Sequence, residues 1–136
     1  MRLASKTHYG IQILVYLALA PGEDWVSLRS LSQELHLSLP FLKHIAATLK
    51  KSRILKSQGG MHGGYRLGLA PEAISLSSIF KSLNEPIKLT PCKARQCSHQ
   101  KCVTGSFWES VTTNIQSAFD QTTLATILET QTSIKE

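Results

Sequence analysis

Apolar residues recur at helical spacing in the first part of the chain. Between Ser5 and Ala20 they form two adjoining stripes, which predict a first helix with a wide buried surface. The run Pro21 to Asp24 predicts a break. Ser27 then has the character of an N-cap, and leucines at helical spacing predict a second, short helix that ends before His36.

A third helix is predicted after a short connection, with Ser38 as its cap and Pro40 in its first turn. The stripe expected to be buried comprises Leu42, Ile45, Ala46 and Leu49. The outward stripe comprises Phe41, Lys43, His44, Ala47, Lys50 and Lys51. Two short helices, a tight turn and a basic outward face on the second helix are typical of a helix-turn-helix. The alternative is a helical hairpin with a solvated face.

Two short strands are predicted next, at Ile54–Ser57 and Tyr65–Leu69. The connection between them, Gln58–Gly64, is rich in glycine and predicts a flexible hairpin tip. A basic hairpin directly after a recognition helix is a wing. A nucleotide-binding loop is excluded, because such a loop ends in Gly-Lys-Ser/Thr at a helix and this one runs into a strand.

The remainder of the chain predicts further helices. A short one covers Leu76–Leu83 and is stopped by Asn84–Pro86, and a polar loop follows over Lys88–Gly105. Trp108–Phe119 carries one apolar stripe at steps of three and four, which predicts a long helix. Such a helix needs a partner, which is a second copy of the chain, residues Ile11 to Leu19 of the same chain, or both.

The last residues predict little regular structure. Asp120–Thr123 offers a break with caps, and Leu124, Ile127 and Leu128 predict a final short turn of helix. Gln131–Glu136 is expected to fray.

Charge separates the chain into two halves. The net charge is +6, from 15 lysines and arginines against 9 aspartates and glutamates. Residues 1–70 hold nine basic and three acidic residues, nine minus three, and therefore carry all of it. This split favours a half that binds a polyanion, with an ordinary solvated basic face as the alternative. No apolar run reaches the roughly 18 residues that span a bilayer, so we expect a cytoplasmic protein.

All three cysteines, Cys92, Cys97 and Cys102, fall in the polar loop with four residues between neighbours. An odd number of cysteines is a poor disulfide framework, and the clustering favours a metal or iron–sulfur site or a group of redox thiols. Three thiolates leave either kind of metal site one ligand short. The sequence leaves three histidines open for that ligand, namely His8, His62 and His99.

The ordered combination of motifs is more specific than any one of them. It comprises Met1–Leu3, Ser5–Lys6, Tyr9, Leu37–Ser38, Phe41–Leu42, Leu49–Lys51, Ile54–Ser57, Gly63–Leu67, Cys92–Cys102, Trp108 and Thr123–Leu124. The chain thereby resembles, over nearly its whole length, the IscR/NsrR-like winged-helix transcription regulators of the Rrf-two family. The resemblance implies a homodimer that binds a palindrome in double-stranded DNA and pairs through long C-terminal helices. In the sensing branches three cysteines hold a [2Fe–2S] or [4Fe–4S] cluster, whose state alters DNA affinity.

The sequence departs from this family pattern at several positions. Gly59-Gly60 stands where the wing of the best-known members begins Arg-Gly, so Gln58 or His62 is expected to take the place of an arginine in the minor groove. The cysteine spacings are about one residue shorter than usual. Gly105 stands where one branch has its histidine ligand. Another branch uses an acidic residue of the partner's first helix, and the matching position is His8. We therefore expect His8 as fourth ligand, donated by the other subunit, with His99 as second choice.

The expected fold is mainly α with a small β-hairpin wing. Residues 1–83 would form the winged helix-turn-helix domain, 84–105 the cysteine-bearing sensor loop, and 106–136 the dimerisation helix and tail. The DNA-binding set is expected to comprise Arg2, Ser38, Phe41, Lys43, His44, Lys50, Lys51, Gln58 and His62. Within it Lys43 and His44 would read bases, with Phe41 against a thymine methyl or a sugar.

The expected function is transcription regulation, as repressor or activator, controlled by a cluster that senses iron–sulfur status, oxidants or nitric oxide and that can be lost on purification. The alternatives are a cluster-free regulator that senses thiol oxidation and an iron–sulfur carrier or small redox protein. No hydrolytic constellation stands out, and no enzymatic activity is expected.

Overall fold

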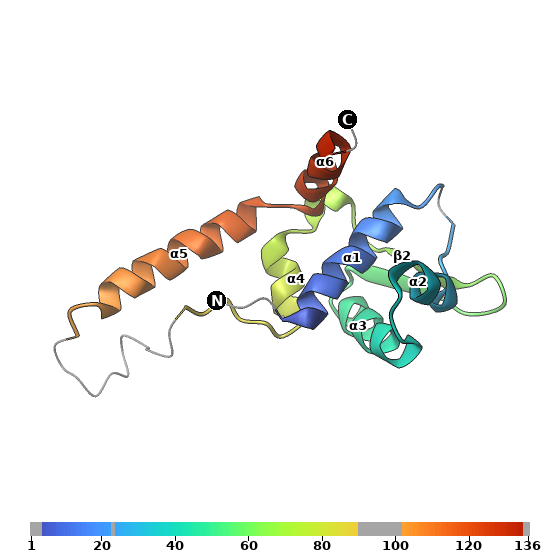
Figure 1. Cartoon of the computed structure of the whole chain (residues 1–136), viewed down its shortest axis with the longest axis horizontal. Helices are drawn as coiled ribbons and strands as arrows, with labels where there is room; N and C mark the ends of the chain where they lie inside the picture. Colours follow the sequence, from blue (N-terminus) through green and yellow to red (C-terminus); the bar gives the residue numbers. More distant parts are fainter. Residues whose placement is uncertain (1–3, 23, 90–101, 135–136) are drawn as a thin grey trace.

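The structure is a computed structural model that describes residues 4–22, 24–89 and 102–134. The elements, in chain order, are α1 (Ser5–Leu19), α2 (Leu28–Leu35), α3 (Leu39–Lys51), β1 (Leu55–Gln58), β2 (Gly64–Leu67), the 3-10 helix η1 (Pro71–Ala73), α4 (Leu76–Ser82), α5 (Gly105–Gln121) and α6 (Leu124–Ile134). The predicted fold, mostly helical with one β-hairpin, is confirmed (Figure 1).

Helix α1 lies at the centre of the fold and contacts α2, α3, α4, α6 and β2 (Figure 1). Ile13, Leu14 and Leu17 on it are buried, as its two apolar stripes predict. Gly10 brings α1 close to the end of α4, since a Cβ there would lie 2.9 Å from a methyl carbon of Leu83. The surrounding elements thus depend on one buried helix for their relative positions.

The helix-turn-helix pair has the predicted boundaries to within a residue or two. Ser27 caps α2, because its side chain accepts a hydrogen bond from the backbone N–H of Ser30 at 3.1 Å. Ser38 occupies the predicted N-cap position of α3, although its side chain accepts no cap hydrogen bond. Pro40 lies in the first turn of α3 and has no N–H to satisfy, which removes one of the donors that a cap would serve.

The wing is a two-stranded antiparallel sheet in which Leu55 pairs with Leu67 and Gln58 with Gly64. Its strands begin and end within two residues of the predicted ones. Val26, just before α2, forms a β-bridge with Tyr65 of β2, with hydrogen bonds of 3.0 and 2.8 Å in the two directions. The hairpin is therefore tied to the helix-turn-helix by main-chain hydrogen bonds.

Helix α5 projects away from the rest of the molecule, and its first residues are those farthest from the core (Figure 1). It packs mainly against α4, where the rings of Phe80 and Phe119 lie 5.0 Å apart between centroids. None of its residues is buried. Within this chain the long helix does not pack back along α1, which was one of the two possibilities that its apolar stripe left open.

Helix α6 is the C-terminal element that returns to the core. Its 11 residues extend well beyond the predicted short turn, and the expectation that residues from Gln131 onward fray is wrong up to Ile134. Leu124 is fully buried in the same cluster as Ile13 and Ile74. The backbone N–H of Leu124 donates to the Ile74 carbonyl oxygen at 2.8 Å, and that of Leu76 donates to the Thr122 carbonyl oxygen at 2.7 Å. Burial of one apolar face, absent for α5, stabilises α6 against the domain.

Within the described parts of the chain, no helix combines the length and the apolar character that crossing a membrane requires.

Candidate nucleic-acid interface and cysteine segment

The connection between α2 and α3 is fixed by local hydrogen bonds. His36 at the end of α2 has φ 52°, in the left-handed region, and the Ser32 hydroxyl donates to the Leu37 carbonyl oxygen at 2.6 Å. Leu31 and Leu42, one from each helix, are fully buried. These contacts set the direction of α3 and so determine which of its faces is turned to solvent.

The outward face of α3 is basic, as predicted. Lys43, His44, Lys50 and Lys51 are all exposed, and the helix contains no acidic residue. Phe41 differs from these residues because it is half-buried, with its ring edge-to-face against Tyr9 at 5.7 Å between centroids. The exposed side chains extend along α3 for nearly its whole length, a surface suited to the edge of a polyanion.

The tip of the wing presents three exposed side chains, Gln58, Met61 and His62. Met61 is 95 % exposed. A hollow of about 960 Å³ lies between this tip and the end of α1, and Trp25 and Leu19 are among the residues that line it. Gln58 and His62, the two residues predicted to replace a minor-groove arginine, therefore lie at the same end of the hairpin, Gln58 as the last residue of β1 and His62 in the connection that follows.

Only part of the predicted cysteine site falls within the described residues. Cys92, Cys97 and His99 lie outside them, as does Arg2 of the predicted DNA-binding set. Cys102 is exposed just before α5, and its Sγ lies 3.7 Å from the Thr104 hydroxyl oxygen. His8 is exposed on α1, beside the ring of Tyr9 at 5.3 Å. Among the described residues, no group of three or more potential ligands surrounds a common point.

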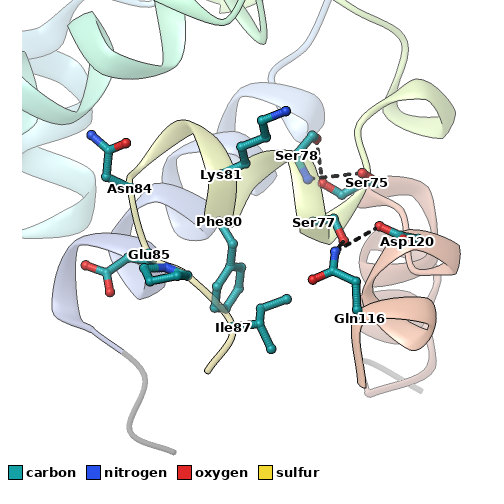
Figure 2. A pocket seen from close by; sticks show the side chains of 11 residues that line it. Ser75, Ser77, Ser78, Phe80, Lys81, Asn84, Glu85, Ile87, Gln116 and Asp120 are labelled. Atoms are coloured by element: carbon teal, nitrogen blue, oxygen red, sulfur yellow. Dashed lines mark hydrogen bonds between the residues drawn. The ribbon is translucent and has the colours of Figure 1, made fainter. Parts of the chain in front are cut away.

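A hollow of about 630 Å³ is lined by α4, by the residues that follow it up to Ile87, and by Gln116 and Asp120 of α5 (Figure 2). Phe80 and Ile87 lie side by side within it, whereas Lys81 and Asn84 point away from them (Figure 2). Where α5 lines the hollow, the Gln116 amide donates to the Ser77 hydroxyl at 3.0 Å and to an Asp120 carboxylate oxygen at 3.3 Å (Figure 2). These contacts orient α5 relative to α4.

The free end of α5 carries exposed apolar side chains. Phe107 is 57 % and Trp108 39 % exposed, and their rings contact one another at 5.1 Å. Val111 and Ile115 continue the same stripe and are half-buried. Large exposed apolar groups gathered on one helix are typical of surfaces that bind another protein.

The sequence analysis assigned no function to two charged side chains, Lys6 and Arg66, that form contacts near the helix-turn-helix and the wing. The Lys6 ammonium lies 3.4 Å from a Glu85 carboxylate oxygen, and the Arg66 guanidinium lies 4.3 Å from the centre of the Trp25 ring. Each pair joins residues that are remote in the sequence. Periodicity carries no signal for such a contact, whereas covariation between the two positions in an alignment would carry one.

Comparison with known proteins agrees with this architecture. The family profile described as iron-dependent transcriptional regulator, the Rrf-two family, matches residues 3–130. A protein of Haemophilus influenzae named as a helix-turn-helix-type transcriptional regulator is 36 % identical over 130 residues, which cover 94 % of this chain and 87 % of that protein. The relatives are named as regulators rather than as enzymes, in agreement with the prediction.

Two solved structures are similar over nearly the whole chain. T. potens IscR superposes with a TM-score of 0.77 at 33 % identity, covering 96 % of this chain and 88 % of that one. CymR, the global cysteine regulator of B. subtilis, superposes with a TM-score of 0.81 at 28 % identity, covering 95 % and 97 %. With its helix-turn-helix, its anchored wing and these relatives, the chain belongs to the Rrf-two family of winged-helix, DNA-binding transcription regulators.

Proposed function

We propose that the protein is a homodimer that binds a palindromic operator in double-stranded DNA and that an iron–sulfur cluster controls its affinity for that operator. The observation that carries the DNA-binding part is the outward face of α3, with exposed Lys43, His44, Lys50 and Lys51 and no carboxylate on the helix. A helix of this kind enters the major groove. Because such a protein binds genomic DNA, we place it in the cytoplasm.

The proposed contacts divide into two kinds. Lys43 and His44, near the start of α3, read base edges, whereas Lys50, Lys51 and Arg2 hold phosphates. Ser38 and Phe41 precede the base-reading residues. One part of the Phe41 ring packs against Tyr9, and the remaining part contacts a thymine methyl or a sugar. Gln58 and His62 on the wing tip reach the adjacent minor groove.

Dimerisation is proposed through α5. Its exposed apolar side chains, Phe107 and Trp108 above all, find no cover within the described part of the chain. A second copy of the same helix covers them with closed two-fold symmetry, and two related α3 helices then match a palindrome with half-sites about one helical turn apart.

The proposed cluster ligands are Cys92, Cys97 and Cys102, with His8 of the other subunit as fourth and His99 as second choice. Thiolate and imidazole are donors that iron–sulfur clusters accept, so the residue types present fit the group. The two members that the structure describes, Cys102 and His8, are both exposed and accessible to it. When bound, the cluster supplies redox and ligand-exchange chemistry. His8 lies on α1, which contacts α3, so ligation there links the sensor to the DNA-reading helix.

The first experiment is iron and sulfide analysis with the visible spectrum, on protein purified without oxygen. Stoichiometric iron and charge-transfer absorption, lost in Cys97→Ala, are expected. His8→Ala and His99→Ala then identify the fourth ligand. Protein that stays iron-free after reconstitution, yet loses DNA binding on peroxide treatment, would replace the cluster by thiol oxidation, for which the exposed Cys102 is suited. Cluster transfer to an acceptor without selective DNA binding would instead identify a cluster carrier.

A further inference from the structure

A hollow of about 440 Å³, lined by basic side chains, lies beside the outward face of α3. The start of α1, one side of α3 and the end of α4 enclose it. His44, Thr48 and Lys51, spaced four and three residues apart along α3, line one wall, and Lys6 in the first turn of α1 lines the facing wall. No carboxylate is among the described residues that line it. The positive end of the α1 dipole adds to the same field.

One anionic group already lies at the edge of this hollow. The carboxylate of Glu85 contacts the Lys6 ammonium at 3.4 Å. The two side chains are 35 % (Lys6) and 29 % (Glu85) exposed, so water and salt reach the pair. Ion pairs at this level of exposure are weak. A competing anion with a denser local charge can therefore displace the carboxylate, and duplex DNA carries such a charge along its backbone.

The backbone of Glu85 is held firmly at the end of α4. Asn84 has φ 55° and donates its N–H to the Lys81 carbonyl oxygen at 3.2 Å. The N–H of Glu85 donates to the Phe80 carbonyl oxygen at 2.9 Å. These two bonds form a Schellman motif, which ends the helix and fixes the chain direction. The carboxylate therefore starts from a fixed point next to Lys6 and only its side chain has to rotate away.

We propose that this hollow seats a phosphodiester of the DNA backbone and that Glu85 occupies its place on Lys6 while the protein is free. Binding DNA then exchanges one anion for another at Lys6, and Glu85 acts as a built-in competitor that lowers affinity for every sequence alike. Lys51 holds the same phosphate from α3. This inference rests on the DNA-binding function proposed above and adds to it a contact and its internal inhibitor.

The test measures binding of the full-length protein to its selected operator and to an unrelated duplex, each over a range of salt concentrations. Glu85→Gln is expected to tighten binding to both duplexes about twofold to fivefold at low salt. Lys6→Gln is expected to weaken binding and to reduce the slope of log K against log salt by about 0.9 per subunit. In the Lys6→Gln background, Glu85→Gln is expected to add nothing, because the cation it frees is absent.

Glu72→Gln is the matched control, because it removes the same charge from an exposed position on η1, away from the hollow. The inference is overturned if Glu85→Gln fails to tighten binding, if it tightens binding equally without Lys6, or if Glu72→Gln has the same effect. In each of these cases salt-dependent binding by the wild type would leave the DNA-binding function standing. Absence of wild-type binding to both duplexes would overturn both.

A titration with inorganic phosphate, followed by NMR at Lys6 and His44, separates DNA from a free anion as the ligand. Shifts that saturate at low phosphate concentration, with no competition by duplex DNA, would overturn the assignment to the DNA backbone. Weak phosphate binding that the duplex displaces is the expected result.

Discussion

The guanidinium of Arg66 lies over the face of Trp25, 4.3 Å from the ring centre, and joins the second strand of the wing to the segment before α2. Next to this contact, Val26 and Tyr65 exchange two main-chain hydrogen bonds. A hairpin of two four-residue strands is only marginally stable by itself. The stacked pair and the bridge therefore hold the wing in place relative to the recognition helix.

A double-mutant cycle measures the stacked pair. Trp25→Leu and Arg66→Met each remove the cation–π contact, and we expect a coupling free energy of about 0.5–1 kcal/mol between them in urea unfolding. Trp25→Phe keeps an aromatic face and is expected to retain part of the coupling. Strictly additive effects of Trp25→Leu and Arg66→Met on the free energy of unfolding would contradict the assigned contact.

Gly64 allows the close approach of β2 to the segment before α2. A Cβ at this position would lie 2.3 Å from the Val26 carbonyl oxygen, closer than two such atoms can come. Gly64→Ala is therefore expected to lower the free energy of unfolding by more than about 1 kcal/mol. Gly59→Ala is the control, because a Cβ there meets nothing within 4 Å. It should stay within about 0.5 kcal/mol of the wild type. Equal effects of the two changes would refute the packing described for the wing.

Asn84 ends α4 in the left-handed region, at φ 55°. A residue with an ordinary side chain pays for this conformation, so Asn84→Ala is expected to destabilise the fold by about 1 kcal/mol. Asn84→Gly should be neutral or slightly stabilising, because glycine adopts positive φ freely. Thermal or urea unfolding of the two variants provides the measurement, and a destabilisation by glycine as large as that by alanine would argue against the Schellman motif.

The exposed apolar stripe of α5 allows a direct test of the proposed dimer interface. Val111→Glu places a charge within the apolar stripe and is expected to shift the protein toward monomer in sedimentation experiments at several concentrations. Ser110→Glu introduces the same side chain at an exposed position one residue earlier, about 100° around the helix and outside the apolar stripe, and should leave the association unchanged. If both variants remain dimeric, the interface lies elsewhere.

Variants of two lysines of α3 distinguish a proposed phosphate contact, Lys50, from a proposed base contact, Lys43. Lys50→Ala is expected to weaken binding to all sequences alike and to reduce the salt slope by about 0.9 per subunit. Lys43→Ala is expected to change which bases are preferred at one or two operator positions, with about 1–3 kcal/mol of lost discrimination there. Selection of binding sites from random duplexes with each variant tests both. Unchanged affinity and preference in both variants would show that another surface meets DNA.

The local sequence pattern determined the positions of the helices and the hairpin in the first half of the chain. The helical spacing of α1, α2 and α3, the cap at Ser27 and the glycine-rich hairpin tip all arise from interactions between residues close together in the sequence. The basic face of α3 could be predicted for the same reason, because a helix with one buried stripe must turn its remaining positions outward. The order of these motifs was enough to indicate the family.

Other features depended on the tertiary structure, because they join segments that are remote along the chain. The sequence pattern predicted only a short turn of helix and a frayed tail at the end of the chain. In the structure Leu124 is buried in the core with Ile13 and Ile74, and this burial stabilises α6. The pairs Lys6–Glu85 and Trp25–Arg66 likewise form only once α1, α4 and the wing have packed. A periodic pattern reports which face of an element is buried, whereas packing decides which other element that face meets.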